Sequence, residues 1–248
     1  MRNLRLIIEY DGTRYGGWME SASGHKETSV QEKLTDVLVQ MEGAPVELIG
    51  AIRTEAGVHA YRQIANFHTA SAKKTYEIKQ YLNRYLPRDI AVLEVQEADE
   101  RFHAAFQAKG FVFEYHIAVG EVPSVFERRY QYYCFKRPDV AKMREAAAQL
   151  VGTKDFRAFS DNRRMKKSTL RTITAIEIYA DEKELVITIQ GDDFWPNMVR
   201  NLVGTLLAAG HGELDAERLP ELIAAGDRTK LPIAVEPKGL FLADVRYT

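Results

Sequence analysis

The sequence has one cysteine, no long apolar run and almost no net charge, and each absence narrows the class of protein. Cys134 alone cannot form an intramolecular disulfide or a cysteine metal site, and we interpret it as a small buried apolar residue. Although 46% of the residues are hydrophobic, no stretch approaches the roughly 20 consecutive apolar residues of a membrane-spanning helix. The composition is that of a globular chain with a sizeable core.

The chain also lacks a signal-like start and an obvious linker. Residues 1–5 lead directly into a strand-like pattern, without the apolar stretch and cleavage site of a signal peptide, which predicts a cytoplasmic location. No segment rich in Pro, Gly or Ser divides the 248 residues. One large domain, or two halves that pack intimately, is therefore expected.

A general excess of positive charge is missing as well. The 34 Lys and Arg residues face 35 Asp and Glu residues, for a net charge of −1, whereas nucleic-acid affinity usually depends on cations that meet phosphates. Local basic clusters occur at Lys73-Lys74, at Arg128-Arg129, and at Arg163, Arg164, Lys166, Lys167 and Arg171. These clusters could form a basic stripe, and solvated loops explain each of them equally well.

Hydrophobic periodicity predicts a mixture of strands and helices. Ser29 and Glu32 form a capping box, and apolar residues at helical spacing follow. Strands are expected at about 3–10, 45–51, 62–69, 90–97, 111–119, 130–136, 170–180, 184–190 and 239–247. Helices are expected from Ser29, at 76–86, from Pro138, at 196–209 and near 216–225.

This succession predicts an α+β fold with a mainly antiparallel sheet backed by helices, because strict βαβ alternation is absent. A similar unit occurs twice in coarse outline. The predicted division is 1–105 and 106–248.

A series of short motifs then identifies a family resemblance. The segment Arg53-Thr54-Glu55-Ala56-Gly57-Val58-His59-Ala60 is similar to the catalytic loop of the tRNA pseudouridine synthase A family, with Glu55 where that family has aspartate. Further motifs follow in the family's order along nearly the whole chain: Glu9-Tyr10-Asp11-Gly12-Thr13, Gly17-Trp18, Leu86-Pro87-Arg88-Asp89-Ile90, Arg101-Phe102-His103-Ala104, Leu170-Arg171-Thr172-Ile173, Asn197-Met198-Val199-Arg200-Asn201 and Lys238-Gly239-Leu240-Phe241.

The resemblance implies an isomerase that needs no metal or organic cofactor. It would break the bond between ribose and N1 of uridine in the anticodon stem-loop of tRNA, rotate the base and rejoin it through C5. The resemblance also implies two RRM-like halves with helices on one side of the sheet, a central cleft between the halves, and a homodimer that holds tRNA.

Glu55 is the catalytic candidate, because glycosidic cleavage needs a carboxylate near the anomeric carbon. Arg53 is expected to pair with a carboxylate or a phosphate through its planar guanidinium. Phe113, Tyr115 and Arg200 are the other substrate-binding candidates. The candidate RNA contacts are Arg14, Arg163, Arg164, Lys166 and Lys167.

Several positions depart from the family pattern. Glu55 adds one methylene at the reacting group, and Phe113 stands where the family has a tyrosine, so any role of that hydroxyl is lost. Ala105 replaces an expected arginine. These departures leave two alternatives to a working tRNA pseudouridine synthase: a non-catalytic RNA-binding protein of the same fold, or an enzyme that acts on a small nucleoside or nucleotide.

Overall fold

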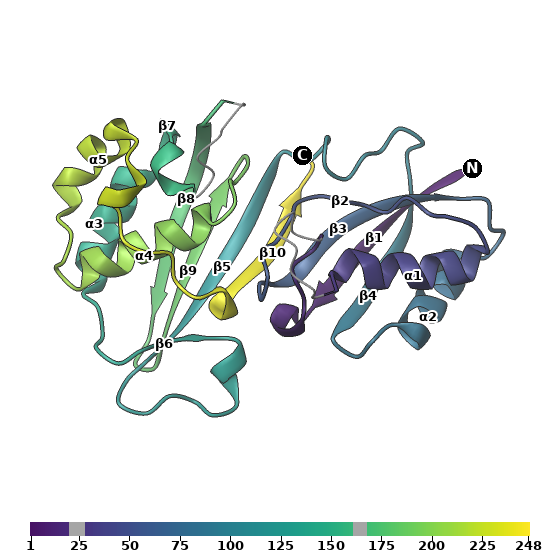
Figure 1. The fold of residues 1–248 in the computed structure, drawn as a ribbon, viewed down its shortest axis with the longest axis horizontal. Helices are drawn as coiled ribbons and strands as arrows, with labels where there is room; N and C mark the ends of the chain where they lie inside the picture. The colour runs from purple at the N-terminus through teal and green to yellow at the C-terminus, as the bar shows by residue number, and fades with distance from the viewer. Residues whose placement is uncertain (20–27, 161–167) are drawn as a thin grey trace. The chain divides into compact units, whose positions relative to one another are not determined.

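The chain divides into two compact units (Figure 1). The computed structural model describes residues 1–19, 28–160 and 168–248. The first unit comprises Met1–Lys109 and Phe241–Thr248, and the second comprises Gly110–Leu240.

The C-terminal strand is where this division differs from the one predicted from the sequence, which kept all of 106–248 together. Phe241 and Leu242 of β10 (Leu240–Arg246) lie opposite His59 and Ala60 in a parallel pairing with β3. This pairing brings the last strand to the first unit.

The first unit is an α+β sandwich of one sheet and two helices. Besides most of β10, its strands and helices are β1 (Arg2–Tyr10), α1 (Val30–Glu42), β2 (Ile49–Gly50), β3 (His59–Thr69), α2 (Thr75–Tyr85) and β4 (Ile90–Ala98). β1 pairs antiparallel with both β3 and β4, and β2 pairs antiparallel with β3. The strand order is β4-β1-β3, with both β10 and β2 paired to β3, and the β-α-β-β-α-β succession from β1 to β4 is the split βαβ arrangement.

The second unit repeats part of this plan. Its elements are β5 (Gly110–Val119), β6 (Tyr132–Cys134), α3 (Val140–Leu150), β7 (Gly152–Asp155), β8 (Leu170–Ala180), β9 (Glu184–Gly191), α4 (Met198–Gly210) and α5 (Leu219–Ala225). β5 pairs antiparallel with β9, and β9 with β8, as β1 pairs with β3 and β3 with β2. The mixed, mostly antiparallel α+β fold expected from the sequence is confirmed, and the coarse repeat has a structural basis.

Local sequence signals set most element ends. The Ser29 hydroxyl accepts a hydrogen bond from the main-chain N–H of Glu32 (3.1 Å), and the Glu32 carboxylate accepts one from the Ser29 N–H (3.4 Å), which confirms the capping box. Helix α3 differs from the prediction that Pro138 opens it. The Asp139 carboxylate caps α3 and the helix begins at Val140, so Pro138 lies before the cap.

Strand β2 is shorter than expected, and its second residue lies against a tryptophan side chain. Only Ile49 and Gly50 pair with β3. A Cβ at Gly50 would lie 2.2 Å from Nε1 of Trp18, so the indole packs directly on this backbone. The Ala51 N–H still donates to the Ile64 carbonyl of β3 (2.8 Å), and the chain then continues into the loop that carries Glu55.

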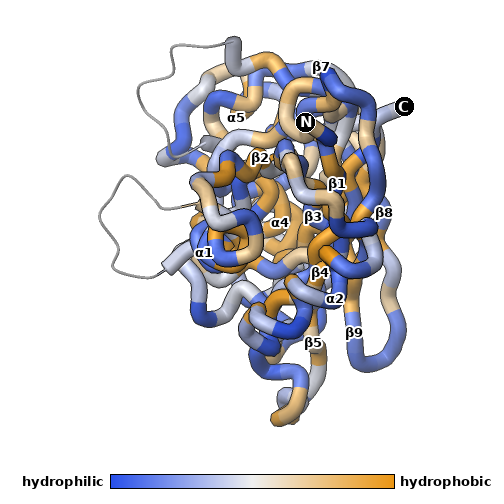
Figure 2. Tube along the Cα trace, turned by 90° about the vertical axis from the view of Figure 1, so that its right-hand side faces the viewer, coloured by the Kyte–Doolittle hydropathy of each residue, from blue (hydrophilic) through white to orange (hydrophobic). Residues whose placement is uncertain are grey.

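Helix α4 forms the centre of the second unit's core. Twelve of its thirteen residues are buried, which is typical of a helix that is apolar on all sides. Figure 2 colours much of α4 as hydrophobic. Arg200 is the one residue of α4 that is not buried. Across residues 1–19, 28–160 and 168–248, no helix combines the length and hydrophobicity needed to cross a membrane.

Candidate active site

Glu55 lies at the start of a tight turn between β2 and β3. The main-chain N–H of Val58 donates to the carbonyl of Glu55 (3.2 Å), and Gly57 has φ of +77° at the third position of this four-residue turn. A positive φ at this position is what a type II turn requires, and glycine meets it without strain. The Glu55 side chain is half-buried.

Two glycines from the segment after β1 press against this turn. A Cβ at Gly12 would lie 2.0 Å from the carbonyl oxygen of Val58, and a Cβ at Gly17 would lie 2.3 Å from that of Thr54. Gly17 also has φ of +103°. Because these two positions are glycines, the backbone of the segment after β1 can lie directly against the backbone of the Glu55 loop.

Hydrogen bonds fix the residue that precedes Glu55. The main-chain N–H of Trp18 donates to the Thr54 carbonyl (3.2 Å), and the Thr54 hydroxyl bonds with the Tyr10 hydroxyl (2.8 Å). Burial raises the pKa of Tyr10. Hydrogen bonds with Thr54 and Gln63 oppose this rise in pKa, and the nearby negative charge of Glu55 adds to it. Tyr10 was not among the site candidates, although it belongs to a motif that the sequence identified.

His59 is buried at the end of the same loop. Its Nδ1 lies 3.0 Å from the main-chain nitrogen of Gly12 and 3.2 Å from Oδ1 of Asp11, and its ring stacks on Phe241 at 4.6 Å. Nδ1 accepts from Gly12 when it is unprotonated and donates to Asp11 when it carries a proton, so only one of these bonds forms at a time. Both arrangements tie the loop to the segment after β1, a structural role.

Arg53 is exposed, and the structure gives it no carboxylate partner among residues 1–19, 28–160 and 168–248. The sequence predicted a carboxylate or a phosphate as the partner of Arg53, and a phosphate of the substrate therefore remains the prediction.

Phe113 and Tyr115 both lie on β5 in the second unit, and both are buried. The Phe113 ring meets Phe194 edge to face at 5.3 Å. The Tyr115 hydroxyl donates to the carbonyl of Glu236 (2.8 Å), and burial raises its pKa, an effect that the positive charge of Arg200 opposes. Phe113 and Tyr115 are therefore packed like core residues of the second unit.

Arg200 is held on the surface of α4 by two contacts. Its Nε donates to the carbonyl of Val235 (2.6 Å), and its Nη1 donates to Oδ1 of Asn197 (2.8 Å). Asn197 is the one non-glycine residue with positive φ (+62°) in the described parts of the chain. Asparagine adopts this conformation more readily than other non-glycine residues, and the Asn197 amide oxygen here accepts from Arg200. Hydrogen bonds from Nε and Nη1 thus fix the orientation of the Arg200 guanidinium.

Arg171 is a second arginine of this unit that the site candidates omitted. It is 13% exposed, its Nη2 lies 2.9 Å from Oδ2 of Asp193, and its guanidinium lies 4.3 Å from the centre of the Trp195 ring. The sequence signal was present, because Arg171 belongs to one of the family motifs. Its aspartate and tryptophan partners could not be identified from the sequence.

The basic candidates have different surroundings. Arg14 pairs with Asp89, which also accepts from the Tyr15 hydroxyl (2.6 Å), so its charge is partly balanced. Arg163, Arg164, Lys166 and Lys167 lie outside the described residues.

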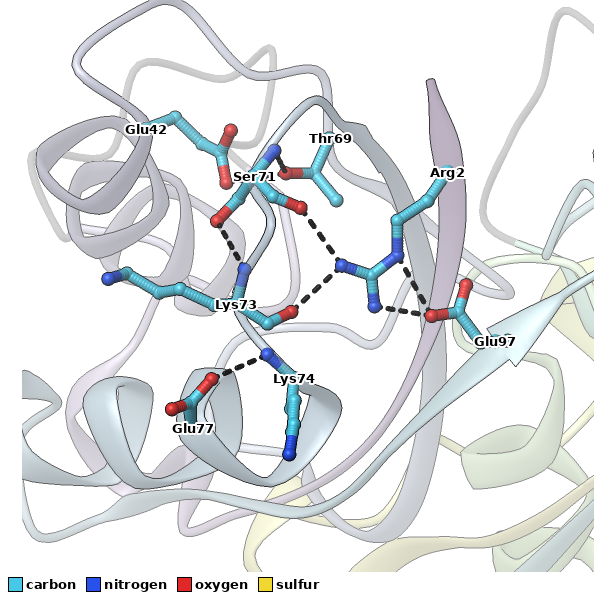
Figure 3. Close-up of polar contacts among 8 residues, drawn as sticks. All are labelled: Arg2, Glu42, Thr69, Ser71, Lys73, Lys74, Glu77 and Glu97. Atoms are coloured by element: carbon cyan, nitrogen blue, oxygen red, sulfur yellow. Dashed lines mark hydrogen bonds and ion pairs between the residues drawn. The ribbon is translucent and has the colours of Figure 1, made fainter.

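Lys73 and Lys74 lie on a segment whose main chain is hydrogen-bonded to the Arg2 side chain. Figure 3 shows the Arg2 guanidinium donating to the carbonyls of Ser71 (2.9 Å) and Lys73 (2.8 Å) and bonding with Glu97. The two lysine side chains are exposed. In the parts of the chain that the structure describes, no group of three or more His, Cys, Asp or Glu side chains could hold a metal ion.

Comparisons with known proteins agree with this architecture. A family model described as tRNA pseudouridine synthase matches residues 6–107 and 146–248, more than four fifths of the chain. "tRNA pseudouridine synthase A 2" of a Bacillus cereus strain is 38% identical, and that of Clostridium perfringens is 40% identical. "tRNA pseudouridine synthase A" of Acetivibrio thermocellus is 39% identical. Each of these comparisons spans 247 residues and covers 100% of both chains. The chain belongs to the tRNA pseudouridine synthase A family.

Proposed function

We propose that this protein is an RNA isomerase that converts uridine to pseudouridine in tRNA, with Glu55 as the reacting carboxylate. The observation that carries the proposal is the construction of the Glu55 turn. Gly12, Gly17 and Tyr10, from two separate family motifs, all pack on or bond to this one loop. Such pre-organisation is expected where a carboxylate must meet the anomeric carbon of a bound nucleotide.

The carboxylate can act as a nucleophile at the anomeric carbon or can remove a proton from the sugar. In either role its distance to the sugar decides the rate. The extra methylene of glutamate must therefore be compensated by the backbone of the loop or by the seating of the substrate.

The substrate contacts are part of the proposal. Arg53 is exposed beside Glu55 and suits a phosphate. Arg200 is oriented by Val235 and Asn197 and suits a second polar group. We also propose the anticodon stem-loop as the target, and contacts to RNA from Arg14, Arg163, Arg164, Lys166 and Lys167. A homodimer and a cytoplasmic location complete the proposal, and sedimentation of the purified protein tests the homodimer.

The test is pseudouridine formation in unmodified tRNA transcripts, read by a chemical modification that stops reverse transcription at pseudouridine. Wild type should form product, Glu55→Ala should form none, and Glu55→Asp shows whether the shorter acid is better or worse. Phe113→Tyr restores the hydroxyl that the family pattern contains and tests whether its absence limits the rate.

The two alternatives give different results. A non-catalytic RNA-binding protein would bind tRNA in a salt-dependent way, unaffected by Glu55→Ala, without product. An enzyme on a small nucleoside or nucleotide would turn over that substrate and leave tRNA unbound at physiological salt. Product only from Glu55→Asp, or from neither protein, would overturn the assignment of Glu55 as a working catalytic acid.

A further inference from the structure

A buried polar network lies directly beneath the Glu55 loop. Tyr10 is 3% exposed, and Gln63 is fully buried. The Tyr10 hydroxyl bonds with the Thr54 hydroxyl at 2.8 Å, and the Gln63 side chain is close enough to oppose the rise in the pKa of Tyr10. The Gln63 amide in turn donates to the carbonyl of Ile52 at 2.8 Å.

The network holds the loop at two points on the N-terminal side of Glu55. Ile52 and Thr54 are three residues and one residue before it, and strands β1 and β3 supply the groups that bond to them. Both strands are central elements of a rigid sheet. Sites supported by such elements are positioned more accurately than sites on unsupported loops.

The C-terminal side of the turn is held by main-chain hydrogen bonds and, where the loop ends, by the buried His59 side chain. The N–H of Gly57 donates to the Tyr15 carbonyl (3.3 Å), and the N–H of Val58 donates to the carbonyl of Glu55 itself (3.2 Å). Side-chain substitutions leave these bonds in place. The Tyr10–Thr54 contact is a side-chain support of the residue next to Glu55, and a substitution can remove it without changing the main-chain bonds.

We propose that the buried hydroxyl pair of Tyr10 and Thr54 positions the Glu55 carboxylate for the reaction. Tyr10 is a positioning residue that acts through Thr54. The inference rests on the proposed function, since it gives Glu55 the reacting role, and it assigns to Tyr10 a task within that site. In a chain with a longer acid than its family pattern, the fixed position of Thr54 limits where the extra methylene can place the carboxylate.

The first readout is turnover of tRNA by Tyr10→Phe, Thr54→Val and Thr54→Ser. Tyr10→Phe and Thr54→Val each remove one hydroxyl with little change in shape, and each should lower kcat by about tenfold with KM for tRNA unchanged. This loss is smaller than the roughly hundredfold cost of a 1 Å misplacement. Thr54→Ser keeps the hydroxyl and should keep most of kcat. The double variant should lose no more than either single variant, because both remove the same bond.

Tyr247→Phe is the matched control. Tyr247 belongs to the same unit, and its hydroxyl donates to the Ala104 carbonyl at the same 2.8 Å distance. Removal of the Tyr247 hydroxyl should lower thermal stability and leave kcat unchanged. If Tyr10→Phe only lowers stability, as Tyr247→Phe does, while kcat per folded molecule is retained, the positioning role is wrong.

The second readout needs no turnover and separates this inference from the proposed function. The side-chain carboxyl carbon of Glu55, assigned by its loss in Glu55→Gln with ¹³C-labelled glutamate, reports the surroundings of the carboxylate. Tyr10→Phe and Thr54→Val should shift or broaden this resonance, and Tyr247→Phe should not. A wild type without product whose Glu55 resonance still responds would overturn the proposed function and support the positioning. If the Glu55 resonance is the same in Tyr10→Phe as in wild type, and kcat is also unchanged, the proposed positioning role of Tyr10 is wrong.

Discussion

Gly17→Ala should damage the candidate site far more than another glycine substitution with the same kind of backbone constraint. A Cβ at Gly17 would lie 2.3 Å from the Thr54 carbonyl oxygen, and ordinary contact begins at 3.4 Å. The two chain segments must therefore separate by about 1 Å. A displacement of about 1 Å at a reacting group costs on the order of a hundredfold in rate.

The matched variant is Gly43→Ala at the C-terminal cap of α1. Gly43 also has positive φ (+69°), but a Cβ there would meet nothing within 4 Å. Gly43→Ala should therefore lower the unfolding free energy only through the strain of a positive φ at alanine, by about 1–2 kcal/mol. Gly17→Ala adds a steric overlap to a strained φ of +103°, for a total of roughly 2–5 kcal/mol.

Urea unfolding followed by circular dichroism gives both free energies, and the pseudouridine assay gives kcat corrected for the folded fraction. We expect Gly17→Ala to lose about a hundredfold in kcat and Gly43→Ala to lose none. If folded Gly17→Ala keeps kcat within about twofold of Gly43→Ala, the packing of this glycine does not place Glu55, and the link from loop geometry to rate fails.

Two further predictions concern the second unit. Burial alone would lower the pKa of His116, but its contacts with Glu114 and Glu184 outweigh burial and raise this pKa. The charged imidazole then stabilises the folded state fully below its ordinary pKa of about 6.5, and this stabilisation is lost as pH rises through the raised value. The difference in unfolding free energy between wild type and His116→Gln should therefore shrink from pH 6 to pH 9, and a difference that grows would contradict the assignment. Asn201 is fully buried, donates to a main-chain carbonyl (2.7 Å) and accepts from Arg228 (2.5 Å). Asn201→Leu should cost about 2–3 kcal/mol in urea unfolding, because these partners stay in place without their bonds, and a cost below about 0.5 kcal/mol would refute this account.

Patterns that depend on neighbours along the chain were predictable from the sequence. The capping box at Ser29, the helix that ends before Pro87 and the alternating strands all follow from local preferences, and the structure shows them. The packing of the Trp18 indole on Gly50 of the short strand β2 was not predictable, because it joins segments more than thirty residues apart. The parallel pairing of β10 with β3 is a still longer-range contact.

The candidate site shows the same limit. The motif order identified the Glu55 loop, but it could not show that Gly12 and Gly17 pack against that loop, or that Tyr10 bonds to Thr54. The charge of Arg14 looked available for RNA in the sequence and is paired with Asp89 in the structure. Motifs thus gave candidates for the site, and the fold gave the described candidates their partners.

The aromatic positions of β5 bear on how the reaction could proceed without the family's tyrosine. Phe113 and Tyr115 are two residues apart, so their side chains leave the strand on the same face. The Tyr115 hydroxyl is nevertheless unsuited to replace the missing one, because it already donates to the Glu236 carbonyl and its pKa is raised by burial. This hydroxyl would have to break its bond to the main-chain carbonyl before it could serve a substrate. Phe113→Tyr therefore tests, better than any change at Tyr115, whether a phenol at the family's position raises the rate above what the proposed Glu55 carboxylate supports.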